Sequence, residues 1–229
     1  MKKNRKLSDL VRRIGDGRIS FRLAEERDLP IIREWWKDPS SKFYFNRRKT
    51  FTDKGRIKLA VGALAPPINY RPREGNRNLF PDEIPMIVEA VFSDRKPAVP
   101  IGIFVLEKID WGKGEASFRI FVDSRYRRLK YGLEMMILIF DFVFTTLEFT
   151  RLYASTISRL NDRTEKFMIQ VGFRLADRIK KYVKRGDERY DLVTFEIFPH
   201  RAERVRNKFQ ENRDRIMQNY RVYSHEGSL

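Results

Sequence analysis

The chain contains no cysteine, so it can form neither a disulfide nor a thiolate nucleophile nor a cysteine-ligated zinc site. Histidine is nearly absent as well. Its two copies, His200 and His225, both lie in the C-terminal region. This placement argues against a histidine-based catalytic triad and against a multi-histidine metal centre, and we expect no metal site.

Long apolar runs are also missing. The most apolar stretch, Met135–Phe144, is interrupted by Asp141 and is too short to cross a membrane, so it predicts a buried helix. The charged start of the chain, residues 1–7, is not followed by the apolar segment that a secretory signal requires. We therefore expect a cytoplasmic protein with no transmembrane segment.

Acidic residues are the scarcer charged type, since 48 Lys and Arg face 31 Asp and Glu, a formal net charge of +17. Such an excess favours a polyanionic partner such as RNA, although a well-solvated surface on a heat-adapted protein is the alternative. The basic residues concentrate in an arm over residues 1–17 and again over residues 42–77, where they alternate with aromatic residues. The 42–77 region predicts binding of RNA or another polyanion, or a lid whose aromatic side chains only pack.

The remaining pattern alternates strands with helices. Within the arm, Leu7, Leu10, Val11 and Ile14 fall at helical spacing and predict a short amphipathic helix. We expect a main domain over residues 18–198 and a basic amphipathic helix with a tail over residues 199–229. The predicted fold class is α+β, with a mixed, mostly antiparallel central sheet and helices on both faces.

The centre of the domain is the stretch from Phe118 to Phe173. It reads as a strand (Phe118–Val122), a basic turn, a buried helix (Leu133–Leu147), a second strand (Arg151–Ile157) and a capped helix. This order predicts a parallel strand pair joined by a right-handed crossover. The basic turn before the first helix predicts an anion site, because free N–H groups and cations converge there.

Three segments of this chain resemble the GNAT superfamily of N-acyltransferases, in its ribosomal-protein N-terminal acetyltransferase branch. They are the strand-and-turn segment ending in Arg127-Arg128-Leu129-Lys130-Tyr131-Gly132, the helix running from Asn161-Asp162-Arg163-Thr164 to Gly172-Phe173, and the hairpin Gly186–Phe195. The loop that binds CoA in this family is degenerate here, because Lys130 stands at a glycine position.

The resemblance implies acetyl-CoA as co-substrate. Main-chain groups beside a bulge in the fourth strand, at Ile120, Phe121 and Val122, would hold the pantetheine and polarise the thioester carbonyl. The pyrophosphate would lie against Arg127, Arg128, Leu129, Lys130, Tyr131 and Gly132, and Asn161 would hold CoA or a water molecule. Lys130 either clamps the phosphates or closes the site.

The resemblance also implies an acid, and the predicted strands offer two bases. Thr164 would face the departing thiolate. Many relatives place a tyrosine acid where this chain has Met168, so Tyr131 or a water molecule is the alternative. Glu115 and Glu89, expected on adjacent strands, are the candidate general bases, because a partly buried carboxylate can be tuned toward neutral pH.

Together these patterns predict an acetyl-CoA-dependent N-acetyltransferase that acts on a primary amine, with a peptide or protein N-terminus as the favoured acceptor. The alternative is a catalytically impaired GNAT-like protein that serves as a nucleic-acid-binding or assembly module. A polyamine is disfavoured as the acceptor, because a strongly cationic protein repels a cationic substrate.

Overall fold

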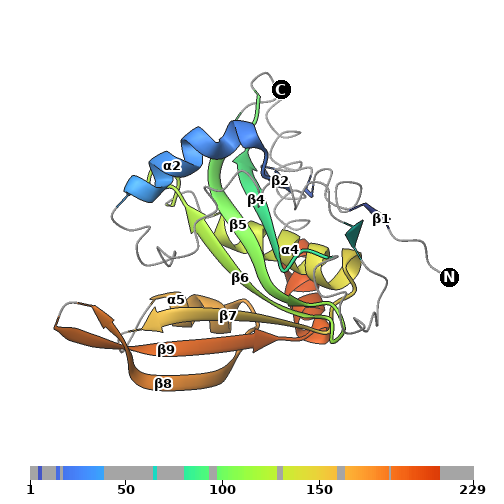
Figure 1. Cartoon of the computed structure of the whole chain (residues 1–229). Helices are drawn as coiled ribbons and strands as arrows, with labels where there is room; N and C mark the ends of the chain where they lie inside the picture. The colour runs from blue at the N-terminus through green and yellow to red at the C-terminus, as the bar shows by residue number, and fades with distance from the viewer. Residues whose placement is uncertain are drawn as a thin grey trace, which may run out of the picture.

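A computed structural model describes residues 5–6, 14–15, 18–38, 64–65, 80–92, 97–127, 131–158, 163–185 and 187–211 (Figure 1). Its centre is a seven-stranded sheet in the order β2-β4-β5-β6-β7-β9-β8. The strands are β2 (Ile19–Leu23), β4 (Glu83–Ala90), β5 (Val99–Asp110), β6 (Glu115–Val122), β7 (Arg151–Ser158), β8 (Arg174–Arg185) and β9 (Glu188–Ile197). Neighbouring strands are antiparallel except β6 and β7. The expected fold class and the expected parallel pair are confirmed.

Helices cover both faces of this sheet (Figure 1). On one face, the helix α2 (Leu29–Lys37) packs Ile32 and Trp35 against Phe121. The other face carries the larger core, to which α4 (Gly132–Phe140), α5 (Arg163–Gln170) and a helix over residues 199–211 contribute. Successive strand residues point to opposite faces, so β4, β5 and β6 each supply side chains to both cores.

The helix expected over Leu133–Leu147 has two parts. After α4, the turn widens into the π-helix η3 (Asp141–Thr146), and the N–H of Leu147 bonds the carbonyl of Phe142. Asp141, the first residue of η3, pairs with Arg206 of the helix 199–211 at 2.9 Å. The ion pair thus lies at the junction of the two helix types and links η3 to the C-terminal helix.

The helix expected in the arm is contradicted at Ile14, and residues 7–13 lie outside the described residues. Arg5–Lys6 form strand β1, which pairs with β3 (Leu64–Ala65), and Ile14 bridges Phe21, so these residues of the arm are extended rather than helical. Asp28, which directly precedes α2, makes no side-chain hydrogen bond that caps this helix. Apart from β3, the basic 42–77 region lies outside the described residues.

Candidate active site

The site begins where β6 and β7 part. The two strands pair only from Glu115↔Arg151 to Phe118↔Ala154. Beyond that point β6 remains paired with β5 as far as Val122, and β7 remains paired with β9 as far as Ser158. The main chains of the two strands therefore diverge, as Figure 1 shows at the ends of β6 and β7, and this V-shaped parting of the main chains is called the opening.

The main chain of β6 presents polar groups to this opening. The N–H of Asp123 bonds the carbonyl of Ile101 on β5 at 2.9 Å. Because main-chain direction alternates along an antiparallel pair, Phe121 turns its N–H and C=O toward β5, whereas Ile120 and Val122 turn theirs toward the opening. Phe121, expected to serve with its neighbours, instead has its main chain directed to β5 and its side chain buried against Trp35.

The bulge implied by the family resemblance is not at this position. The β5–β6 register runs without a shift from Gly102↔Val122 to Glu107↔Ser117 and breaks only between Glu107 and Asp110. The strand is held close to its neighbour here, since a Cβ on Gly102 would lie 2.2 Å from the carbonyl oxygen of Phe121. The parting of β6 from β7, rather than a bulge, directs main-chain groups into the opening.

Asp123 lies at the mouth, directly after β6, and only 6% of it is exposed. Its carboxylate accepts hydrogen bonds from Trp35 Nε1 at 3.2 Å, from the main-chain N–H of Arg125 at 3.0 Å, and from the Arg125 guanidinium. The bonds from the Arg125 side chain contribute most to lowering the pKa of Asp123, and burial opposes them. Asp123 therefore joins α2 to the end of β6 as an anion.

Arg127, expected to bind phosphate, folds back over the strand end. Its Nε donates to the carbonyl oxygen of Val122 at 2.7 Å, and its guanidinium lies over the ring of Phe121 and 3.8 Å from Asp38. This placement keeps a cation beside the opening. It also shows that one carbonyl facing the opening already has a partner.

The start of α4 follows closely. Gly132 is its first residue, so the positive end of the helix dipole lies at the end of the basic turn. A Cβ on Gly132 would lie 3.2 Å from Cζ of Phe167, so packing between α4 and α5 favours glycine here. Tyr131 is buried, with the guanidinium of Arg18 over its ring. Arg128, Leu129 and Lys130 lie outside the described residues.

The second half of the predicted site lies on α5. Thr164 is in its first turn and half-buried, and Met168 is buried in the larger core, where it packs rather than faces solvent. Gly172 closes the helix at φ 93°, as the Gly-Phe signature predicts, and the N–H of Phe173 bonds the carbonyl of Met168. Asn161 lies outside the described residues.

The structure does not bring the two candidate bases together. Glu89 and Glu115 were expected on adjacent strands, but β5 lies between β4 and β6. Glu89 accepts a hydrogen bond from Arg22 at 2.8 Å, and Arg22 also binds Asp28. Glu115 is at the paired end of β6, 3.6 Å from Arg151, and so lies away from the opening. Their roles as bases stay predictions.

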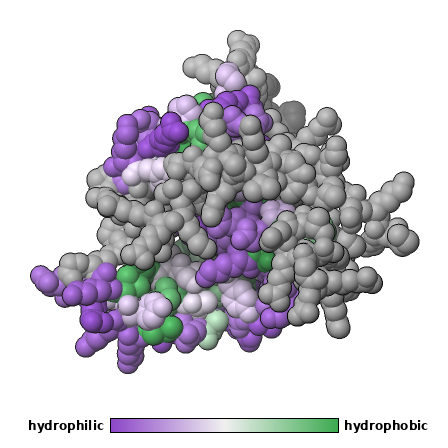
Figure 2. All heavy atoms as spheres, in the orientation of Figure 1, coloured by the Kyte–Doolittle hydropathy of each residue, from purple (hydrophilic) through white to green (hydrophobic). Residues whose placement is uncertain are grey.

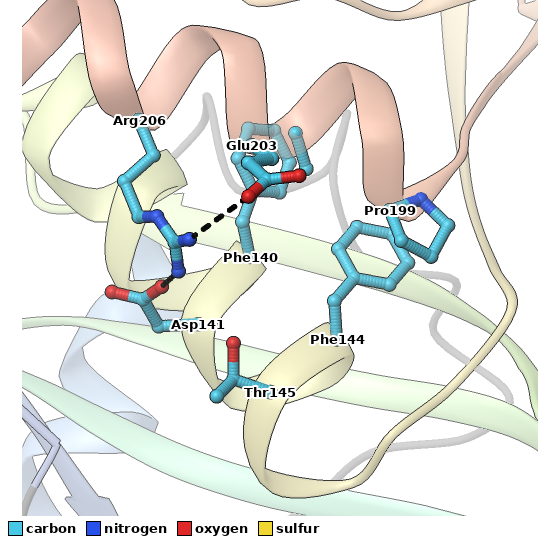
Figure 3. Close-up of a pocket in the computed structure, with 8 residues that line it drawn as sticks. Phe140, Asp141, Phe144, Thr145, Pro199, Glu203 and Arg206 are labelled. Carbon is cyan, nitrogen blue, oxygen red and sulfur yellow. Dashed lines mark hydrogen bonds and ion pairs between the residues drawn. The ribbon is translucent and has the colours of Figure 1, made fainter.

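A separate hollow of about 200 Å³ lies between η3 and the C-terminal helix. Figure 3 shows Phe144 beside Pro199 and Phe140 behind Glu203, and Asp141 and Glu203 are each joined to Arg206. Both acids pair with Arg206, at 2.9 Å and 3.9 Å. The hollow is built from elements other than the parting strands, so it is distinct from the candidate active site.

A mixed sheet with one parallel pair that parts beside a helix N-terminus is the arrangement of the GNAT fold, and the solved structures reported below share it. The family model of the GNAT acetyltransferase domain matches residues 18–174, and the chain belongs to this family. It is therefore an N-acetyltransferase of the GNAT type that uses acetyl-CoA as co-substrate. The ribosomal-protein branch stays a prediction.

Solved structures match the same fold. Spermidine N-acetyltransferase from Vibrio cholerae in complex with CoA and spermine has a TM-score of 0.62 and 15% identity, covering 82% of this chain and 99% of that chain. A chimera of the Vibrio cholerae enzyme SpeG and hSSAT gives 0.62 and 16%, covering 81% and 98%. At such identities the likeness concerns the fold alone. No curated protein sequence matches the chain. Among the described residues, no helix is long and apolar enough to span a membrane.

Proposed function

We propose that the acceptor is the amino group at the N-terminus of a peptide or protein. The observation that supports this acceptor is the surface beside the opening, on the sheet face that carries α2. There Ile157, Leu192 and Ile179 form an apolar row across β7, β9 and β8, next to a polar row that includes Ser155 and Thr194. Figure 2 shows hydrophobic side chains over this part of the sheet.

This apolar row can contact the side chains of a peptide whose N-terminal amino group enters the opening. Ile179 is 42% exposed, so apolar surface is available to a ligand. The acids Glu107, Glu115 and Glu196 share this face, but each pairs with an arginine, at 2.6 Å, 3.6 Å and 2.8 Å respectively. Asp177 lies opposite Thr194 on the same face, is exposed, and pairs with no arginine side chain among the described residues, so the face offers an acceptor apolar contact beside this unneutralised carboxylate.

A polyamine is the second candidate, because the solved structures of similar fold include spermidine N-acetyltransferases. Binding a polyamine needs carboxylates that are not already neutralised, since each ammonium loses water on entering a site. The net charge of +17 and the paired acids of the face both oppose this acceptor. The peptide N-terminus is the better supported of the two.

In acetyl transfer, the main role of this chain is to position acetyl-CoA and the acceptor amine. Acetyl-CoA supplies the acetyl thioester when it is bound. The N–H groups of Ile120 and Val122 are oriented to hold the pantetheine and polarise a carbonyl, and Thr164 is the candidate proton donor. A peptide α-amine has a pKa of about 7.7–8.0, so a large fraction is neutral at mildly alkaline pH without a strong base.

The catalytically impaired alternative is motivated by Met168, which replaces an acid, and by Lys130 in the CoA loop. Calorimetric titration with acetyl-CoA and with desulfo-CoA separates the two readings. Binding followed by acetylation of peptide amines supports the enzyme, whereas a folded protein that binds neither ligand supports the alternative.

The main-chain proposal has a direct test in Val122→Pro. Proline removes the N–H of residue 122, which faces the opening, but leaves the bonds of Phe121 and Asp123 to β5 in place. We expect the fold to survive and kcat/KM for a peptide acceptor to fall about 100-fold, the scale for loss of one preorganised donor. Val122→Ala retains the N–H and is the control. Equal activity of the two folded variants would refute the role.

A further inference from the structure

The hairpin of β8 and β9 projects from the body of the molecule (Figure 1). Its register breaks between the pairs Ile179↔Leu192 and Val183↔Tyr190. Three residues of β8, 180–182, therefore lie opposite the single residue Asp191 of β9. Because β8 is the edge strand of the sheet, this bulge faces outward with no neighbouring strand of the sheet beside it.

Asp191 holds the bulge in one conformation. Its Oδ1 accepts the main-chain N–H of Lys181 at 2.9 Å, and its Oδ2 accepts Arg178 at 3.1 Å. The N–H of Lys181 is the main cause of a lowered pKa of Asp191, followed by Arg178. Lys181 has a φ of 53°, a left-handed conformation that is unfavourable for a residue with a side chain. Strained backbone that specific hydrogen bonds hold in place is found mostly at functional sites, so the bulge is a candidate functional site.

The bulge displays cations and one aromatic ring. Lys180, Lys181, Lys184 and Arg189 are exposed, and Tyr182 is 63% exposed. The ion pairs among the described residues of the hairpin use Arg174 and Arg178, and the three lysines take part in none of them. Figure 2 shows hydrophilic side chains gathered at this end of the molecule.

Lysines on an edge strand also prevent two sheets from joining, which is a purely structural use. That use does not require an exposed tyrosine. A tyrosine beside lysines is suited to unpaired nucleotides, because bases stack on the ring while ammonium groups contact phosphates. An anionic membrane would engage the lysines without needing the ring.

We propose that the bulge at residues 180–182, with Lys184 and Arg189, binds single-stranded or looped RNA, with Tyr182 stacking on an unpaired base. This surface differs from the basic 42–77 region of the sequence. The proposal does not depend on the identity of the acyl acceptor.

The test uses the whole chain and a fluorescein-labelled oligouridine RNA, followed by fluorescence polarisation from low to physiological salt. The triple variant Lys180→Gln, Lys181→Gln, Lys184→Gln removes three cations from the hairpin. The salt slope of log K should shrink by about 2, since each contact to a single strand contributes about 0.7. The matched control replaces the exposed lysines Lys37, Lys113 and Lys208 by Gln, with the same change in net charge.

Tyr182→Ala isolates the ring and should weaken RNA binding about 10-fold, within the usual range for one stacked base, whereas Tyr182→Phe should retain affinity. Acetyl-CoA affinity should be the same in all these variants, which separates this surface from the active site. Equal losses in the two triple variants would refute the proposal, as would unchanged binding in Tyr182→Ala. Equal affinity for anionic phosphatidylserine vesicles, reduced in the lysine triple variant and unchanged in Tyr182→Ala, would replace RNA by a membrane surface.

Discussion

The effect of replacing Asp123 on stability can be predicted in detail, because this one buried carboxylate joins α2 to the end of β6. Asp123→Ala leaves Trp35 Nε1 without its acceptor in a buried site, a loss of about 1–3 kcal/mol. The ion pair with Arg125 adds at most about 1 kcal/mol, because 70% of that side chain is exposed. We expect a decrease of about 1–4 kcal/mol in the free energy of unfolding.

The assay is urea denaturation at neutral pH, followed by tryptophan fluorescence. Asp123→Asn keeps an oxygen for Trp35 but loses the charge, and should cost about half as much. Asp141→Asn is the control, since this carboxylate, 40% exposed, also pairs with an arginine and its loss should cost less than about 1 kcal/mol. Acetyl-CoA affinity should fall in Asp123→Ala and not in Asp141→Asn, because only Asp123 fixes the end of β6.

The pH dependence follows from the lowered pKa of Asp123. A carboxyl whose pKa is depressed on folding stabilises the protein above its unfolded pKa, about 3.9, and loses this contribution as the pH falls through its folded pKa. The stability gap between wild type and Asp123→Asn should be constant from pH 5 to 8 and shrink below about pH 4. A gap under about 0.5 kcal/mol at neutral pH, or one that grows in acid, would refute this account of the anion.

Three further predictions concern the core, the helix end and the basic turn. Arg22→Ala should cost about 3–5 kcal/mol in urea denaturation, because it leaves Asp28 and Glu89 unpaired in a poorly exposed site. A cost below about 1 kcal/mol would show that water replaces the guanidinium. Gly172→Ala should lower the melting temperature, since the residue has a φ of 93° and a Cβ would lie 2.9 Å from Val205. An unchanged melting temperature would show that the turn adapts. Lys130→Ala should weaken acetyl-CoA by about 1–3 kcal/mol in calorimetry if the ammonium clamps phosphate. Tighter binding would mean that Lys130 obstructs the site.

Much of the sheet could be predicted because its signals are local. β6 and β7 form the parallel pair that two strand patterns around one buried helix require. The consecutive pair Trp35-Trp36 also follows a general property of helices. A helix cannot turn two consecutive side chains inward, and accordingly Trp35 is buried while Trp36 lies at the rim.

The site itself depends on contacts between distant segments, which local patterns do not encode. The opening exists because β6 continues along β5 while β7 continues along β9. Asp123 resembles any acidic residue after a strand until Trp35, 88 positions earlier, bonds to it. The bulge in β8 was also missed. Lys180 and Lys181 fit an edge strand, and only the pairing with β9 shows that three residues oppose one.

The position of β9 has a consequence for how the chain is made. β9 is the last strand in sequence, yet it lies between β7 and β8, so β8 has no partner in the sheet until β9 arrives. During synthesis, one edge of β7 therefore stays unpaired until residue 197, the last residue of β9, has left the ribosome. Until then, the larger core lacks three of its buried side chains, Val193, Phe195 and Ile197. A chain truncated before β9 would present an eight-residue β7 edge and an open core, and should be retained by chaperones or aggregate.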